Sequence, residues 1–297
     1  MKLPPSTYHY CLKVKDDAEI QDALRALAER HPAIGFWQCH YRLRHKGLKW
    51  NHKRLYRVYT SLRLNIRRPS KKRLPERVRL PLSASTAPNQ MWSLDFMSDS
   101  LTDGRKFRLL NIIDDFNRES LALEVDTSLP ALRVIRVLEA VVARKGKPAN
   151  IRCDNGPEFI SHKLQLWCED KQISLQYIQP GQPTQNAYIE RNNGSLRREL
   201  LNAYMFTTLR EVRLMTRDWQ EDYNNYRPHK ALDYQTPQNF YDQWYIRDKK
   251  STNSTGALST SASGDPLRSQ TTTMVDKIFE KTKDDTHKTT LLLNSPN

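Results

Sequence analysis

The spacing of apolar side chains is helical in the first part of the chain. Apolar residues recur every three or four positions, which predicts three amphipathic helices, at 16–30, 35–47 and 51–62. An Asp precedes the first helix, Gly47 closes the second, and Asn51 caps the third. Two short helices joined by a glycine-containing turn, the second of them basic, predict a helix-turn-helix.

The spacing becomes extended near residue 90. The stretch MWSLDFMS alternates apolar and more polar residues, which predicts a strand with Trp92, Leu94 and Phe96 on one face and Asp95 and Met97 on the other. Turn residues separate the two apolar stretches that come next, which indicates an antiparallel meander. We therefore expect two more strands, at 107–116 and 120–126.

Helical and extended patterns alternate in the rest of the core. Apolar residues at Leu132, Val134 or Ile135, Leu138, and Val141 or Val142 recur at helical spacing and predict a helix over 129–146. The following segments predict a strand, a helix, a strand and a longer helix, at 149–153, 161–171, 173–179 and from about 186. This order predicts an α/β fold in which helices flank a mixed sheet.

The charge of the chain is concentrated in one segment. The net charge is +15, and residues 31–81 contribute +14 of it through fifteen Lys and Arg against the single Glu76. A solvated surface normally mixes both signs, so this segment indicates a polyanion partner rather than a merely soluble bundle. We expect the outward face of the third helix to contact DNA through Lys53, Arg54 and Arg57.

These patterns divide the chain into four regions. Residues 1–66 form a helical DNA-binding region, 67–88 a basic linker, 89–247 the α/β core, and 248–297 a Ser/Thr-rich tail that we expect to be disordered. The linker has too many Pro and Arg residues for a helix. We expect it to follow phosphates through Arg67, Arg68, Lys71, Lys72 and Arg73.

The composition argues against an exported or membrane protein. No apolar run approaches the length of a bilayer-spanning helix, and the N-terminus has no apolar signal segment, so we expect a cytoplasmic protein. The four cysteines are widely spaced, which predicts reduced thiols rather than disulfides. A zinc site is not expected, because zinc-finger spacing is absent from His31, Cys39, His40, His45 and His52.

Three acidic residues of the core suggest a metal site. Asp95 lies on the polar face of the first strand, Asp154 ends the fourth, and Glu190 is early in the last helix. The first and fourth strands can be neighbours after a crossover helix, which would bring these carboxylates together. Their repulsion would be offset by divalent cations, and oxygen ligands suit Mg²⁺ or Mn²⁺. Asp-Asn-Gly is also an ordinary turn sequence, so a structural role for Asp154 stays open here.

Other polar residues of the core have open interpretations. We expect Asp114 and Asp115 to cap the turn between two strands, and Glu158 to be either a surface residue or a cap residue. His229 either orients a phosphate or satisfies the end of the helix before Pro228. A similar choice, between a helix cap and a DNA contact, applies to Gln182, Thr184 and Asn186.

Six motifs occur in order between about residues 88 and 245. They are WSLDFMSD, NIIDDFNRE, RCDNGPEF, PGQPTQNAYIE, NGSLRRELLN and YNNYRPHKAL. Together they resemble the second-reading-frame (OrfB) transposase of insertion sequence family three. The thirty-five residues between Asp154 and Glu190 match the D,D(35)E spacing of that family and of retroviral-type integrase cores. HPAIGFW and NHKRLYRVY resemble the family's helix-turn-helix region.

The resemblance implies a ribonuclease-H-like integrase catalytic core at 89–247. It implies a DDE transposase that cleaves DNA and transfers 3′ ends, with Asp95, Asp154 and Glu190 as catalytic ligands of two Mg²⁺ or Mn²⁺ ions. Arg197 stands where the family often has a basic residue near DNA, and a surface ion pair with a helix acid is the alternative. The implied partners are element-end and target DNA, further copies of the chain on DNA, and the product of an upstream reading frame in a nucleoid-associated complex.

Some features depart from the family. Asn192 stands where the family commonly has an aromatic residue, and the tail after about residue 247 resembles nothing in the family core. The upstream frame normally supplies end recognition and a coiled coil, and neither is visible in this sequence. Two alternatives therefore stay open: a regulatory or decayed DNA-binding protein without turnover, and a nuclease that cuts but does not join.

Overall fold

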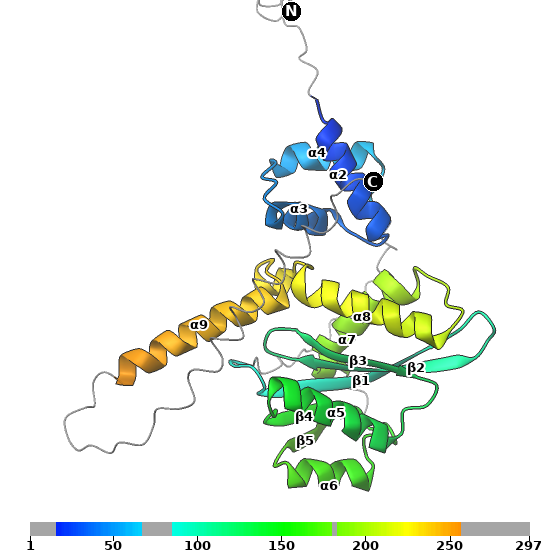
Figure 1. Cartoon of the computed structure of the whole chain (residues 1–297), viewed down its shortest axis with the longest axis vertical. Helices are drawn as coiled ribbons and strands as arrows, with labels where there is room; N and C mark the ends of the chain where they lie inside the picture. Colours follow the sequence, from blue (N-terminus) through cyan, green and yellow to red (C-terminus); the bar gives the residue numbers. More distant parts are fainter. Residues whose placement is uncertain (1–15, 67–84, 180–182, 257–297) are drawn as a thin grey trace, which may run out of the picture. The chain divides into compact units, whose positions relative to one another are not determined.

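The computed structural model describes residues 16–66, 85–179 and 183–256 (Figure 1). Parts of the prediction lie outside these described residues, namely Gln182, the tail beyond 256 and the linker residues Arg67, Arg68, Lys71, Lys72 and Arg73. The chain divides into a compact unit that ends at Ile246 and a second unit from Arg247, and helix α9 (Pro237–Gly256) runs through this boundary. The four predicted regions stay a prediction.

The described part of the first unit begins with three short helices: α2 (Ala18–Arg30), α3 (Phe36–His45) and α4 (His52–Ser61). Each directs apolar side chains into a shared core, in which Leu24 and Leu55 are fully buried. Oδ1 of Asn51 accepts a hydrogen bond from the backbone N–H of Lys53 (2.8 Å), and Gly47 has φ +88°, which favours glycine. The predicted helices, cap and glycine turn are confirmed.

Five strands form one mixed sheet in the order β3-β2-β1-β4-β5. Their bounds are β1 (Met91–Ser100), β2 (Lys106–Asp114), β3 (Ser120–Asp126), β4 (Asn150–Cys153) and β5 (Ser174–Tyr177). β1 pairs antiparallel with β2 and parallel with β4, so the first strand lies at the centre, next to the fourth, as predicted. A parallel pair requires a crossover connection, and helix α5 (Ala131–Lys145) provides it.

Helices cover both faces of this sheet (Figure 1). α5 and α6 (His162–Asp170) pack on one face around buried Trp92 and Leu94. The other face is covered by α7 (Ala187–Leu196), the π-helical turn η2 (Arg197–Leu201) and α8 (Leu209–Asn225). Met97 is therefore buried on the face that the alternation predicted to be polar. The arrangement is the predicted ribonuclease-H-like α/β fold.

The buried stripe of α5 leaves out the first residue of the apolar pattern. Val134, Leu138 and Val141 are buried, but Leu132 is 58% exposed. At 3.6 residues per turn, position 132 lies about 200° around the helix axis from position 134. Leu132 therefore lies off the buried stripe, although it was listed with the residues at helical spacing.

Leu138→Ala should lower the free energy of unfolding by about 2–5 kcal/mol, because it leaves a cavity between α5 and the sheet. Leu132→Ala on the same helix should change it by less than about 0.5 kcal/mol, because that side chain is exposed. Urea unfolding of the full chain, followed by circular dichroism, measures both. Equal losses in the two variants would contradict the orientation of α5.

Candidate active site

The pairing of parallel strands brings two of the predicted acids together. Ser93 on β1 pairs with Arg152 on β4 at the last position of the ladder. Two residues further along the chain from each come Asp95 and Asp154. Because the two strands run in the same direction, both carboxylates lie just beyond the last paired position of β1 and β4.

Helix α7 carries Glu190 to the same end of the β1–β4 pair. At its N-terminus, Nδ2 of Asn186 donates a hydrogen bond to the carbonyl of Leu94 (3.3 Å) and makes no side-chain cap on the helix. Further along, Nδ2 of Asn193 donates to Oδ2 of Asp95 (2.7 Å). These two bonds fasten α7 to β1 on either side of Glu190, whose side chain is exposed.

The pKa of Asp95 is affected by its burial and by the other two acids. Its pKa is raised to about 6, mainly by burial and further by the negative charges of Asp154 and Glu190. Hydrogen bonds from the backbone N–H of Phe96 and from Asn193 act in the opposite direction, because they stabilise the ionised form. Partial loss of hydration also raises the pKa of Glu190. The structure therefore brings the three predicted acids into electrostatic contact.

The oxygen ligands at this site suit a hard divalent cation. All three are carboxylates, and oxygen ligands are those that Mg²⁺ and Mn²⁺ prefer. The nearby thiol of Cys153 is buried, and burial raises its pKa, so it is not the thiolate that zinc would bind. Over the described ranges, no three His, Cys, Asp or Glu side chains are already arranged to hold an ion.

The turn after Asp154 is built closely around its carboxylate. The backbone N–H of Gly156 donates to Oδ1 of Asp154 (3.1 Å), and Nδ2 of Asn155 donates to the carbonyl of Ile178 (3.0 Å). A Cβ at Gly156 would lie 3.1 Å from the same Oδ1, which is too close to fit without a shift. Asp154 thus makes the ordinary turn and also belongs to the acidic group.

Asp114 and Asp115 have the structural role that was predicted. Oδ2 of Asp114 accepts a hydrogen bond from the backbone N–H of Asn89 (2.8 Å), and burial raises the pKa of Asp114 to about 6. Asp115 accepts from Oγ of Ser93 (2.7 Å) and pairs with Arg152 (2.9 Å). These buried contacts join β1, β4 and the turn after β2 next to the candidate site.

Glu158 and His229 are also structural. Glu158 pairs with Arg108, and the hydrogen bond from Arg108 lowers the pKa of the Glu158 carboxyl. Nε2 of His229 donates to the carbonyl of Tyr223 (3.2 Å) in the last turn of α8. Burial lowers the pKa of His229 to about 3, so the ring is neutral. Of its two predicted roles, His229 has that of satisfying the helix end.

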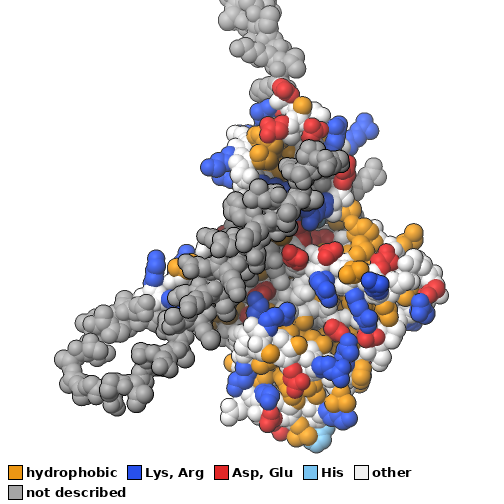
Figure 2. Space-filling model, viewed as in Figure 1, with side chains coloured by type: hydrophobic (Ala, Val, Ile, Leu, Met, Phe, Trp, Pro, Cys, Tyr) orange, Lys and Arg blue, Asp and Glu red, His pale blue; other side chains and the backbone are white. Residues whose placement is uncertain are grey.

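Two of the predicted DNA-contacting residues on α4 pair with one acid, Asp17. Asp17 accepts hydrogen bonds from Nε of Arg54 (2.8 Å) and Nη2 of Arg57 (2.6 Å), and Lys53 is exposed. The Arg side chains remain 39% and 58% exposed. On the face drawn in Figure 2, Lys and Arg side chains are interspersed with Asp and Glu over the sheet and its helices. The three α4 residues stay predicted DNA contacts.

Arg197 is held against the central strand. Its Nη2 donates to the carbonyl of Ser98 (2.9 Å), and its Nη1 lies 3.3 Å from Oδ2 of Asp99. The acid that it pairs with therefore belongs to β1, not to a helix. The Arg197 side chain is 40% exposed, and its contact with DNA stays a prediction.

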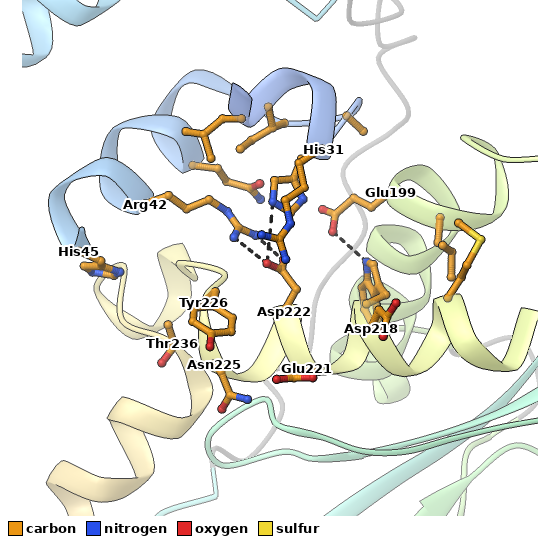
Figure 3. Close-up of a pocket in the computed structure, with 18 of the residues that line it drawn as sticks. His31, Arg42, His45, Glu199, Asp218, Glu221, Asp222, Asn225, Tyr226 and Thr236 are labelled. Atoms are coloured by element: carbon orange, nitrogen blue, oxygen red, sulfur yellow. Dashed lines mark hydrogen bonds and ion pairs between the residues drawn. The ribbon is translucent and has the colours of Figure 1, made fainter. Parts of the chain in front are cut away.

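A pocket of about 850 Å³ lies elsewhere in the first unit (Figure 3). Arg42 donates to both carboxylate oxygens of Asp222 there (2.7 and 2.5 Å), and Nε2 of His31 lies 3.9 Å from that carboxylate. None of the three acids of the candidate site lines this pocket. The pocket is therefore separate from the site formed by the three acids, despite its volume.

Two asparagines beside the acids were not predicted from the sequence. Asn193 contacts Asp95, and Asn111 on β2 donates to Oδ1 of Asn193 (2.6 Å). Asn111 is an isolated amide in the apolar stretch FRLLNIID and is fully buried. A polar residue inside a buried strand marks a specific hydrogen-bond network, so this pattern is the signal that could have revealed Asn111.

Comparisons with known proteins agree with the layout of the core. Residues 85–183 and 171–237 match two family models, both described as integrase core domain. The chain is 39% identical to the insertion element IS407 uncharacterized 31.7 kDa protein of Burkholderia multivorans, over 80% of this chain and 86% of that protein. It is 24% identical to the putative transposase InsK for IS150 of Escherichia coli, over 82% of this chain and 92% of that protein.

Among solved structures, the chain is similar to the HTLV-2 integrase catalytic core domain in complex with magnesium. The TM-score is 0.44 at 20% identity, and the match covers 52% of this chain and 98% of that one. In the described part of the chain, no helix combines the length and apolar character needed to cross a bilayer.

Asp154→Asn should lower the pKa of Asp95 from about 6 in metal-free protein, because it removes one of the charges that repel the Asp95 carboxylate. A carboxyl whose pKa is raised by folding stabilises the folded state at low pH. This contribution to the free energy of unfolding is lost as the pH rises through about 6. The variant should therefore be more stable than wild type above pH 6, by up to about 1 kcal/mol. NMR titration and urea unfolding measure the two effects.

Glu169→Gln is the control, because it removes an exposed charge from α6. It should leave the pKa of Asp95 unchanged. An Asp95 that titrates identically in wild type and Asp154→Asn would show that these two carboxylates do not interact.

Proposed function

We propose that this chain cleaves DNA at the ends of an insertion sequence and joins these ends to target DNA. The chain belongs to the integrase core domain family, among the DDE transposases of insertion sequences. One observation carries the proposal. Asp95, Asp154 and Glu190 come from β1, the end of β4 and α7, and the pKa of Asp95 is raised mainly by burial and further by the charges of the other two acids. Clustered acids with a perturbed pKa are typical of active sites.

The proposed reaction consists of two displacements at phosphorus. In the first, water attacks a phosphodiester at the element end, and the bond to the 3′ oxygen breaks to leave a 3′ hydroxyl. In the second, this hydroxyl attacks a phosphodiester of target DNA, and the target's own 3′ oxygen leaves. Both displacements depend on positioning and on stabilisation of negative charge, which the site has to provide.

Asp95, Asp154 and Glu190 would hold two Mg²⁺ or Mn²⁺ ions, which when bound activate the attacking oxygen and stabilise the leaving one. The chain's own part is to hold the carboxylates in place. Oδ1 of Asp95 accepts from the N–H of Phe96 (2.8 Å), and Oδ2 accepts from Asn193 (2.7 Å). Glu190 is exposed, so its carboxylate is open to substrate.

Binding of DNA is assigned to the basic part of the chain. Residues 31–81 carry a net charge of +14, and phosphate contacts from such a segment give affinity without sequence preference. Arg54 and Arg57 already lie side by side on Asp17, where a phosphate would meet both. Assembly of several copies on DNA, association with an upstream-frame product, and a cytoplasmic location at the nucleoid belong to the same proposal.

Glu190→Gln should reduce cleavage and joining on the order of 100-fold or more, because a neutral amide is a poor ligand for a divalent cation. DNA affinity should stay within about twofold, because the basic region supplies it. Assays with labelled element-end DNA measure cleavage, joining and binding on the same preparation.

Glu139→Gln is the matched control, because Glu139 is an exposed acid of α5. It should keep full activity. Metal-dependent cleavage retained by Glu190→Gln would remove Glu190 from the site. A wild-type chain that binds DNA but does not cut it would support the regulatory alternative, and one that cuts without joining would support the nuclease alternative.

Activity should require Mg²⁺ or Mn²⁺, whereas Ca²⁺ should give bound but unreacted complexes, because its looser coordination holds the reacting oxygens poorly. Each ion should raise the thermal stability of the wild type by binding the folded state. The double variant Asp95→Asn, Asp154→Asn should lose this stabilisation. Calorimetry with and without DNA measures it, and an unchanged wild-type midpoint in every ion would speak against a metal site.

A further inference from the structure

Three buried asparagines connect β2 to the candidate site. Asn111 on β2 and Asn192 and Asn193 on α7 are 0%, 2% and 9% exposed. Nδ2 of Asn111 donates to Oδ1 of Asn192 (2.7 Å) and to Oδ1 of Asn193 (2.6 Å). Nδ2 of Asn193 then donates to Oδ2 of Asp95 (2.7 Å). The hydrogen bonds therefore run in one direction, from β2 through α7 to the carboxylate on β1.

The register of the sheet sets up this chain of bonds. Asn111 and Asp95 are direct partners in the antiparallel pairing of β2 with β1. Side chains of such partners leave the sheet on the same face. α7 packs over both strands, so Asn193 reaches the two side chains at once.

Asn111 determines which end of the Asn193 amide meets Asp95. An amide side chain has a donor end and an acceptor end. Because the oxygen of Asn193 accepts from Asn111, its NH₂ group points to Asp95 and donates to the carboxylate. Without Asn111, the oxygen of Asn193 would lose this donor, and the amide would be held less firmly in its bond to the carboxylate.

Packing alone does not account for this network. Within the described residues, Oδ1 of Asn111 is buried and has no hydrogen-bond partner. Unsatisfied buried polar groups lower stability, and apolar side chains of similar size would pack without this cost. Asn192, which replaces the family's aromatic residue, belongs to this network through its contact with Asn111.

We propose that Asn111 is a positioning residue for Asp95, which acts through Asn193 to hold the carboxylate in one orientation. The proposal deepens the proposed function and rests on it, because Asp95 is taken there as a metal ligand. Asn192 is a side branch of the network, since it accepts from Asn111 and does not contact Asp95 through a hydrogen bond. Asn111 and Asn192 therefore make a matched pair, equally buried and differing in whether they control Asn193.

Asn111→Leu should weaken Mn²⁺ binding by the full chain about 10–100-fold, as loss of a group that orients a metal ligand does. It should lower kcat for cleavage and leave KM for DNA unchanged. Asn192→Leu should keep Mn²⁺ affinity within about twofold of wild type, because the bond from Asn111 to Asn193 remains. Electron paramagnetic resonance titration measures the free and bound Mn²⁺.

NMR of the metal-free chain gives a second readout that needs no activity. The side-chain NH₂ resonance of Asn193 should keep the shift of a carboxylate-bonded amide in Asn192→Leu and lose it in Asn111→Leu. Asn111→Val has a β-branched side chain that suits a strand and replaces the Leu variant if that variant does not fold.

Equal losses of Mn²⁺ affinity in the Asn111 and Asn192 variants would reduce the network to packing and overturn the proposal. An Asn193 resonance unchanged in the Asn111 variant would also overturn it. A wild-type chain that binds no Mn²⁺ would overturn the proposed function, and the Asn193 resonance would then still decide whether Asn111 orients Asp95.

Discussion

Burial of the Asp95 carboxylate beside Asp154 and Glu190 is the constraint that the core has to meet. Burying a carboxylate opposes folding, and the charges of its two neighbours add to this cost, so the pKa of Asp95 is raised to about 6. The surrounding structure holds the three acids together nevertheless. The buried Asp115–Arg152 pair joins the turn after β2 to β4, and the Asn186 bond to the carbonyl of Leu94 fixes α7 on the central strand.

The three acids differ in how firmly they are held. Asp95 lies in the middle of the central strand, with a hydrogen bond to each carboxylate oxygen. Asp154 is held by a turn that uses one of its oxygens, and Glu190 projects from a helix into solvent. The site is therefore rigid at the sheet and open at the helix. This arrangement suits a reaction in which a long polymer must approach preformed ligands.

Local patterns were enough to predict most elements of the core. Alternation in MWSLDFMS and helical spacing in 129–146 correspond to β1 and α5, because both patterns depend on neighbours within a few residues. Leu132 lies on the opposite side of α5 from Val134, which a list of apolar residues at approximate helical spacing did not distinguish. The acids were predicted from the strand order and from a family resemblance. The Asn111–Asn193 bond joins residues 82 positions apart, so only the folded register reveals it.

The crossover through α5 also determines when the candidate site can form. Asp95 and Asp154 meet only after β1 has paired with β4, a contact between segments far apart in the chain, and such contacts form late in folding. Glu190 follows still later in the sequence, so a ribosome releases all three acids only after most of the core has been made. A nascent chain therefore carries its basic segment long before it carries a complete set of acids. Under the proposed function, a nascent chain would therefore be able to bind DNA before it could cut it.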